Sequence, residues 1–139
     1  MNEVMIERWN ARVRPQDTVF HCGDFALGKT EPVQAVRDRL NGRIVLIRGN
    51  HDRFGKAKGD ALRLEVVEGY AELSIAGRRF HLSHHPPLRE QMVRGMLHLC
   101  GHIHEEWKIR DRVLNVGVDQ WDFRPLTFEE AAATQPEAF

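Results

Sequence analysis

Four short polar motifs along the chain contain side chains that commonly bind metal ions or transfer protons. In chain order they are HCGDF (21–25), IRGNHD (47–52), LSHHPP (82–87) and GHIH (101–104). Carboxylate, amide and imidazole groups together suit Mn, Fe, Zn or Ni. Two such ions about 3.5–4 Å apart can clamp a phosphate group and lower the pKa of a bound water toward about 7. The residue types therefore favour metal-dependent hydrolysis of a phosphate ester.

Each motif taken alone also has an ordinary structural interpretation. Gly-Asp after a strand is a common turn or helix cap, and Asn50 and Asp52 are typical turn residues. The two histidines of GHIH could be polar residues on an edge strand, and the adjacent pair in LSHHPP could both be exposed. The combination is more specific, because each of the four motifs stands at the end of an expected strand.

Hydrophobic patterning predicts the elements that would position these motifs. Strands are expected at 18–22, 43–48, 65–75, 78–83 and 96–100, with a hairpin over 107–116, helices at 3–13 and 30–40, a loop or short helix at 53–63, and a final helix after the capping box at 127–130. The last two strands before residue 84 are expected to pair antiparallel through the turn at 76–77. The alternation of strands and helices predicts an α/β fold.

The predicted order places the motifs at one edge of the sheet. Strands 18–22 and 43–48, with the helix between them, make a βαβ unit and should be parallel. Asp24 and the Asn50–Asp52 segment should therefore meet at the carboxyl edge, where ligands bind in open α/β sheets. His102 and His104, two positions apart in extended backbone, can point to the same face.

Composition limits the other functions. The chain has 139 residues, 42% of them hydrophobic and 29% charged, and its formal net charge is zero. One domain is expected from this length. Because the net charge is zero, no overall electrostatic field attracts nucleic acid or a membrane. Cys22 and Cys100 lie in apolar stretches and are expected to be buried thiols in a reducing compartment. With no secretory signal and no membrane-spanning apolar run, we expect a cytoplasmic protein.

The four motifs in this order, with the tail LNVGVDQWDFRPLTFEE, resemble the calcineurin-like metallophosphoesterase superfamily, especially its small bacterial and phage phosphoesterases. The resemblance covers about residues 3–130. It implies a two-sheet β-sandwich flanked by helices in four layers (αββα). It also implies two divalent metal ions, with Mn²⁺ expected first and Fe, Zn or Ni as alternatives. The implied activity is hydrolysis of phosphomonoesters or phosphodiesters by an activated water.

The resemblance assigns metal binding to Asp24, Asn50, His84, His102 and His104. In the family pattern, the aspartate bridges both ions. Asn50, His84 and His102 complete the ligand set of the second ion, whereas His104 binds the first ion.

Catalytic and substrate contacts follow from the same resemblance. His51 contacts the phosphate and protonates the leaving group, and Asp52 orients the His51 ring. Arg48, Arg53 and His85 are candidates for contact with the substrate, although an exposed arginine with no such role is an equal expectation.

One departure from the family pattern concerns the N-terminus. The family opens with a strand ending in D-x-H, which gives the first ion two ligands, and no D-x-H precedes Asp24 here. Residues 1–13 resemble the helix that follows that strand. We therefore expect a single, N-terminally truncated domain over 1–139, with a complete second metal site and exposed edges beside the missing strand. Either Met1 is internal to a longer enzyme, or the chain is a natural short form.

Three functions remain open from the sequence. The first is a phosphoesterase acting on small phosphoesters or nucleotides. The second is a catalytically impaired binding or scaffold protein with the same fold. The missing D-x-H favours it, and the intact GNHD and GHIH motifs oppose it. A dedicated nuclease is disfavoured, because the chain is neutral and has no basic–aromatic stripe. The oligomeric state is left open.

Overall fold

The computed structural model describes residues 3–25, 33–52, 55–135 and 137–139. Three parallel strands form its first sheet, sheet A, in the order β1 (Thr18–His21), β2 (Arg43–Ile47) and β3 (Leu64–Val67). The predicted βαβ arrangement of β1 and β2 is confirmed. The connecting helix is described as α2 (Val33–Arg39), and its predicted first turn lies outside the described residues.

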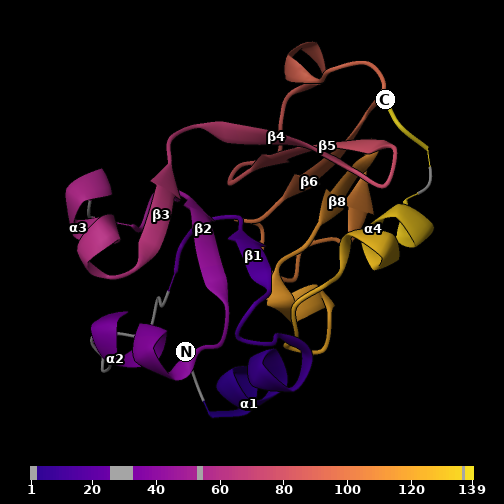
Figure 1. Ribbon diagram of the computed structural model, residues 1–139. Coiled ribbons are helices and arrows are strands. Elements are labelled where there is room, and N and C mark those ends of the chain that lie inside the picture. The colour runs from indigo at the N-terminus through magenta and orange to yellow at the C-terminus, as the bar shows by residue number, and fades with distance from the viewer. Residues whose placement is uncertain (1–2, 26–32, 53–54, 136) are drawn as a thin grey trace.

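Helices cover one face of sheet A (Figure 1). They are α1 (Glu3–Arg12), α2 and α3 (Lys56–Ala61). Ile6 and Trp9 of α1 and Val36 of α2 join a core with Ile44 and Leu46 of β2. The β2 strand is buried along most of its length, so the segment that leads into GNHD is held rigidly between two packed faces.

The second sheet, sheet B, has five strands in the order β4-β5-β6-β8-β7. They are β4 (Tyr70–Ile75), β5 (Arg78–Ser83), β6 (Met96–Cys100), β8 (Val113–Asn115) and β7 (Ile109–Arg110). The expected hairpins β4–β5 and β7–β8 are both antiparallel, whereas β5, β6 and β8 are parallel. The carboxyl ends of β5 and β6 therefore open on the same side of the sheet.

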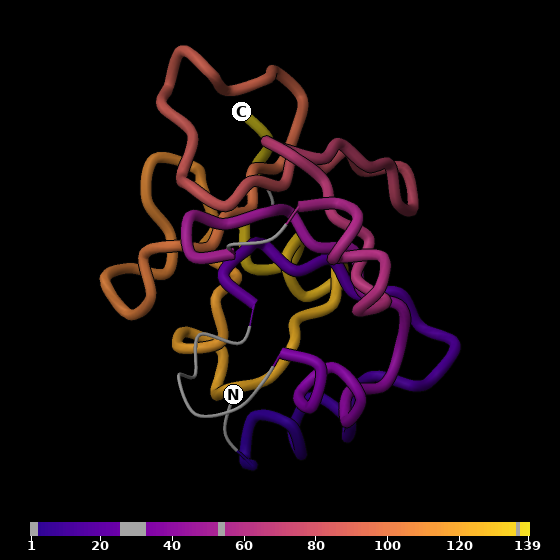
Figure 2. Tube along the Cα trace, turned by 90° about the vertical axis from the view of Figure 1, so that its left-hand side faces the viewer, coloured from indigo at the N-terminus to yellow at the C-terminus, as the bar shows by residue number. Residues whose placement is uncertain are grey.

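The two sheets pack face to face, and this confirms the predicted two-sheet fold flanked by helices (Figures 1 and 2). Ile47 of sheet A lies in one core with Phe80, Leu82 and Leu99 of sheet B. The final helix, α4 (Phe128–Thr134), adds the Phe128 ring, which packs edge-on against rings from both sheets. Its predicted capping box is confirmed by reciprocal bonds between residues 127 and 130.

The structure corrects the strand expected over 65–75. This segment forms two strands in different sheets: β3 pairs with β2, and β4 pairs with β5. The chain crosses between the sheets at Gly69, whose φ of +80° is a conformation that glycine adopts without strain. Strand-forming residues on both sides of this glycine concealed the change of sheet.

Strand β1 is the edge of the described sheet A, and a groove of about 770 Å³ runs beside it. Phe20 and Val19 of β1 line it on one side, and Leu82 and Leu99 of sheet B line it on the other. No helix among the described residues is long and apolar enough to cross a membrane.

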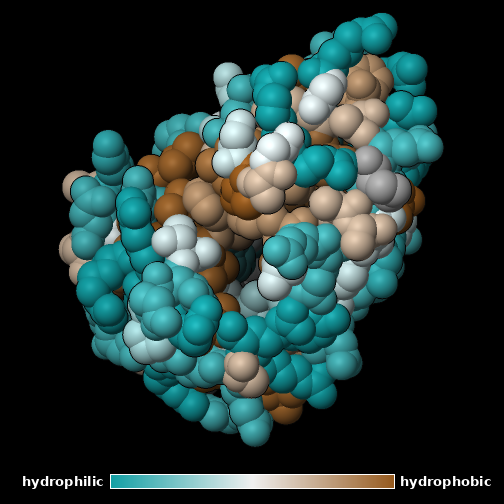
Figure 3. Space-filling model, turned by 45° about the vertical axis from the view of Figure 1, so that its right-hand side comes forward, coloured by the Kyte–Doolittle hydropathy of each residue, from teal (hydrophilic) through white to brown (hydrophobic). Residues whose placement is uncertain are grey.

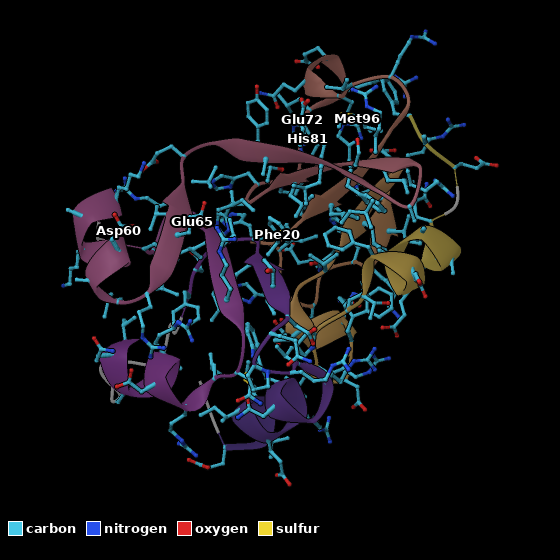
Figure 4. The ribbon with its side chains drawn as sticks, viewed as in Figure 1. Phe20, Asp60, Glu65, Glu72, His81 and Met96 are labelled. Carbon is cyan, nitrogen blue, oxygen red and sulfur yellow. The ribbon has the colours of Figure 1, made fainter. Side chains whose placement is uncertain are left out.

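A second group of histidines lies on the outer face of sheet B, apart from the four motifs. Figure 4 shows Glu72, His81 and Met96 on this face, whereas Phe20 points between the sheets. His81 and His98 are register partners, 7% and 0% exposed, with ring centroids 5.0 Å apart. The Nδ1 atoms of both rings are buried without a hydrogen-bond partner.

These two imidazoles predict acid sensitivity of the fold. Burial lowers the pKa of both below the usual 6.5; Glu72 opposes the shift at both rings, and the charge of His81 adds to it at His98. The unfolded chain therefore binds protons here at a higher pH than the folded chain does. The free energy of unfolding is retained above about pH 6.5 and falls as the pH drops below it.

We expect His81→Phe to reduce this pH dependence. The ring would still stack on Tyr70, whose centroid is 5.0 Å from that of His81, but one titrating group would be lost. Urea unfolding at several pH values from about 7 to about 5 measures how steeply the free energy of unfolding changes with pH. A change in stability that is the same at every pH does not alter this slope. An identical slope in the parent chain and the variant would contradict the account.

Candidate functional site

The four polar motifs meet where strand ends from both sheets come together. Asp24 follows β1, the GNHD motif follows β2, His84 ends β5, and His102 follows β6. The Nδ1 atom of His84 lies 2.7 Å from the carbonyl oxygen of Cys22, so a residue of sheet B is bonded to the end of sheet A. The predicted convergence of Asp24 with the GNHD segment is present.

Three ligand-type atoms surround the other nitrogen of His84. Its Nε2 lies 2.7 Å from Asn50 Oδ1, 3.2 Å from Asp24 Oδ2 and 3.1 Å from His102 Nδ1. The side chains of His84 and Asp24 are only 3% and 7% exposed. Four of the five expected metal ligands therefore form one compact group, in which the His84 and Asp24 side chains are buried and Asn50 and His102 are exposed.

The chemistry of this group fits a cation. A carbonyl oxygen only accepts hydrogen bonds, so His84 Nδ1 carries the proton that faces Cys22. In the neutral imidazole, Nε2 then presents a lone pair toward the oxygens of Asn50 and Asp24. These lone pairs repel one another unless a proton or a shared metal ion lies among them. A backbone carbonyl that fixes the tautomer is also the usual support of a metal-binding histidine.

His102 adds a further neutral ligand. Partial desolvation lowers the pKa of its ring, and charge on His85 and His84 would lower it further, against the opposing effect of Asp24. The ring therefore stays unprotonated to a lower pH than a free imidazole and keeps a lone pair available.

Close backbone approach makes this arrangement possible. A Cβ atom on Gly23 would lie 2.3 Å from His84 Nδ1, and one on Gly49 would lie 2.3 Å from Asp24 Oδ1. Neither position can hold a side chain without displacing a proposed ligand. Asp24 and His102 themselves have positive φ angles of 57° and 69°, an uncommon conformation held here by the surrounding contacts.

Asp52 makes structural contacts that were not expected from the sequence. Its carboxylate accepts hydrogen bonds from three backbone amides, those of Gly49 at 2.7 Å and of Asp24 and Phe25 at 2.8 Å each. The residue is 2% exposed, and no contact with the His51 ring is found among the described residues. Asp52 thus fixes the loops after β1 and β2 to each other, and its expected role in orienting the His51 ring stays a prediction.

His51 contributes through its backbone as well as its ring. Its amide donates to Asp24 Oδ1 at 2.8 Å, which holds the carboxylate in place, and the residue as a whole is exposed. The Arg48 guanidinium contacts the carbonyl oxygen of Asp52 at 3.1 Å and pairs with Glu68 at 3.0 Å. Phosphate binding by Arg48 would require it to leave these partners. The other candidate arginine, Arg53, lies outside the described residues.

His85 lies closer to the predicted metal ligands than expected. It is exposed, but its ring centroid is 4.2 Å from that of His102 and 4.7 Å from that of His84. Nitrogen atoms of the three rings lie within 4.8 Å of one another. His85 therefore borders the candidate site directly.

His104, the fifth expected ligand, lies in a second group. Its Nδ1 is 3.3 Å from Asp119 Oδ2, and Glu105 joins them within 4.8 Å. Neither acidic residue belongs to a motif that indicates metal binding in the sequence. Asp119 lies in the quoted tail, two positions after Gly117, but its proximity to His104 depends on the packing of the β8 segment against the GHIH loop.

Both groups border the groove beside β1. Asp24, His102, His104 and Asp119 all line it. Figure 3 shows one face of the molecule hollowed at its centre, with hydrophobic side chains along one side of the hollow. The two groups thus share one opening, polar at the strand ends and apolar between the sheets.

Comparison with known proteins places this geometry in a family. Residues 2–125 match the calcineurin-like phosphoesterase superfamily domain. An uncharacterised protein of Methanocaldococcus jannaschii is 30% identical over 138 residues, covering 93% of this chain and 72% of that protein.

Two solved structures share the fold. A protein of unknown function from Aquifex aeolicus superposes with a TM-score of 0.68 at 21% identity, covering 94% of this chain and 83% of the other. A protein described as a novel archaeal phosphodiesterase has a TM-score of 0.54 at 23% identity, covering 81% of this chain and 72% of the other. With its family match spanning most of the sequence, this protein belongs to the calcineurin-like phosphoesterase superfamily.

Proposed function

We propose that this member of the phosphoesterase family is a metal-dependent hydrolase of small phosphomonoesters or phosphodiesters. The observation that carries the proposal is the convergence of Asp24, Asn50 and His102 on the Nε2 atom of His84. Oxygen and imidazole ligands of this kind favour Mn²⁺, Fe, Zn or Ni over softer ions. Divalent ions held there would lower the pKa of a bound water and offset the charge of the phosphate.

The chain's own residues supply position and protons. The Asp24 carboxylate is held on one side by the His51 amide, and its backbone is held by Asp52. The exposed His51 ring, on the same loop as Asn50, is our candidate for protonating the leaving oxygen. As the bond from phosphorus to that oxygen breaks, a bond from phosphorus to water forms. General acids of this type typically contribute about 10²–10⁴-fold in rate.

The groove gives a physical limit on the substrate. Its volume of about 770 Å³ lies within the range of small-molecule sites, and Asp24 and His102 are among the residues that line it. We therefore propose a small phosphoester, such as a nucleotide, with its phosphate at the strand ends. The archaeal neighbour described as a phosphodiesterase shares the fold and makes diesters the first class to test.

The first prediction concerns activity. We expect the 139-residue chain to hydrolyse bis-p-nitrophenyl phosphate with Mn²⁺ and to lose this activity in a chelator. His102→Ala should lose it as well, because one of the clustered ligands is removed. His81→Phe, on the outer face of sheet B, is the control and should retain it.

Two results would contradict this proposal. Turnover that persists in chelator or in His102→Ala would exclude a role for this metal group. No turnover by a folded, manganese-loaded chain would reject hydrolysis by this chain and favour the binding or scaffold alternative.

A second prediction distinguishes the role of His51 from that of Asp52. His51→Ala should reduce kcat by about 10²–10⁴-fold and leave Mn²⁺ affinity close to that of the parent chain. Asp52→Asn should instead lower both the stability and the Mn²⁺ affinity. An amide group cannot accept all three backbone hydrogen bonds, and each unpaired buried donor costs about 1–3 kcal/mol.

Urea unfolding and manganese titration measure these effects. Asp60→Asn is the matched control, because Asp60 is exposed on α3 and should change neither quantity (Figure 4). If Asp52→Asn kept the parent stability and metal affinity and reduced only kcat, Asp52 would act on His51 as the sequence had suggested.

A further inference from the structure

We propose that Asp119 and Glu105 are metal ligands, which together with His104 hold one ion of the centre. This inference rests on the proposed function, because it assigns residues to the same metal-dependent site. Neither acidic residue belongs to the four motifs.

The first support is the geometry of the three side chains. One ligand atom from each of His104, Glu105 and Asp119 lies within 4.8 Å of the others. The closest pair, His104 Nδ1 and Asp119 Oδ2, is 3.3 Å apart. One imidazole with two carboxylates is a donor set that suits the same borderline divalent ions as the His84 group.

The second support is a buried amide that joins the two loops carrying these residues. Asn115 is 0% exposed, and its Nδ2 donates to the carbonyl oxygens of His104 at 2.7 Å and Trp107 at 3.0 Å. Its Oδ1 accepts from the Gly117 amide at 2.9 Å, two residues before Asp119. The positions of His104 and Asp119 relative to each other are therefore set by a satisfied buried group, and less by the exposed side chains themselves.

The third support is the shared groove. Asp119 and His104 line it together with Asp24 and His102, so the second group faces the same opening as the first. A second ion at His104 would thus act on the same bound phosphate.

A competing role for Asp119 is to orient His104. Its carboxylate could accept the Nδ1 proton and leave Nε2 as the only ligand of this group. Loss of either kind of residue would lower the metal affinity, by about 10–100-fold for an orienting partner. Only a direct ligand forms a bond to the ion. The two roles are separable by a probe that reports the bond itself.

The test places a thiolate at position 119 and loads the full chain with Co²⁺. We expect Asp119→Cys to gain a near-ultraviolet charge-transfer band, because a thiolate bound to cobalt absorbs there. Glu106→Cys is the matched control. It adds an exposed thiol beside the group, and it should show only the background of the parent chain, whose Cys22 and Cys100 are buried. A spectrum of Asp119→Cys equal to that of Glu106→Cys would overturn direct ligation.

Metal counting gives an independent result. Equilibrium dialysis against Mn²⁺ should give two ions per parent chain and one per Glu105→Gln/Asp119→Asn double variant. Two ions in the double variant would overturn the inference. Circular dichroism should show that each variant keeps the parent fold.

Neither readout depends on turnover, so the two proposals fail separately. A cobalt–thiolate band without hydrolysis would retain this site and reject the hydrolase. Hydrolysis without the band and without loss of an ion would retain the hydrolase and reject the site.

Discussion

The site depends on the imidazole of His84, which bonds the two sheets to each other. This ring leaves the end of β5 in sheet B, and its Nδ1 meets the carbonyl oxygen that ends β1 in sheet A. With that nitrogen fixed as the donor, the Nε2 of the neutral ring faces the oxygens of Asn50 and Asp24 with a lone pair, so that either a proton or a shared metal ion must lie among them. The electrostatic need for a positive charge at this point follows from the packing of the sheets.

The surrounding structure keeps this arrangement from relaxing. Asp52 accepts hydrogen bonds from three backbone amides and so joins the loops after β1 and β2. The side chain of Asn115 joins the loops after β6 and β8 by donating to one and accepting from the other. Both residues are buried, so breaking either set would leave unpaired polar groups away from water. His51 and His85 remain exposed around this rigid centre. A rigid group of candidate metal ligands with two exposed imidazoles at its rim fits the proposed hydrolysis, in which a phosphate is held while protons are exchanged.

The sequence predicted those parts of the fold that depend on local patterning. The buried run before GNHD, the βαβ unit, the hairpins and the capping box at Thr127 were all correctly expected, because period, turn residues and caps are local signals. The division of 65–75 between two sheets was not foreseen, since a single glycine carries the change of direction. Motif order was enough to bring Asp24, Asn50 and His84 together. It could not show that Asp52 bonds to amides or that Asp119 approaches His104, because both depend on how separate loops pack.

The account rests on a divalent ion at the His84 group. The most direct test is a crystal structure grown with Mn²⁺ and measured where manganese scatters anomalously. The account predicts an anomalous peak at bonding distance from His84 Nε2, shared with Asp24, Asn50 and His102. A well-ordered structure with these four side chains in place, saturating manganese and no such peak would contradict it.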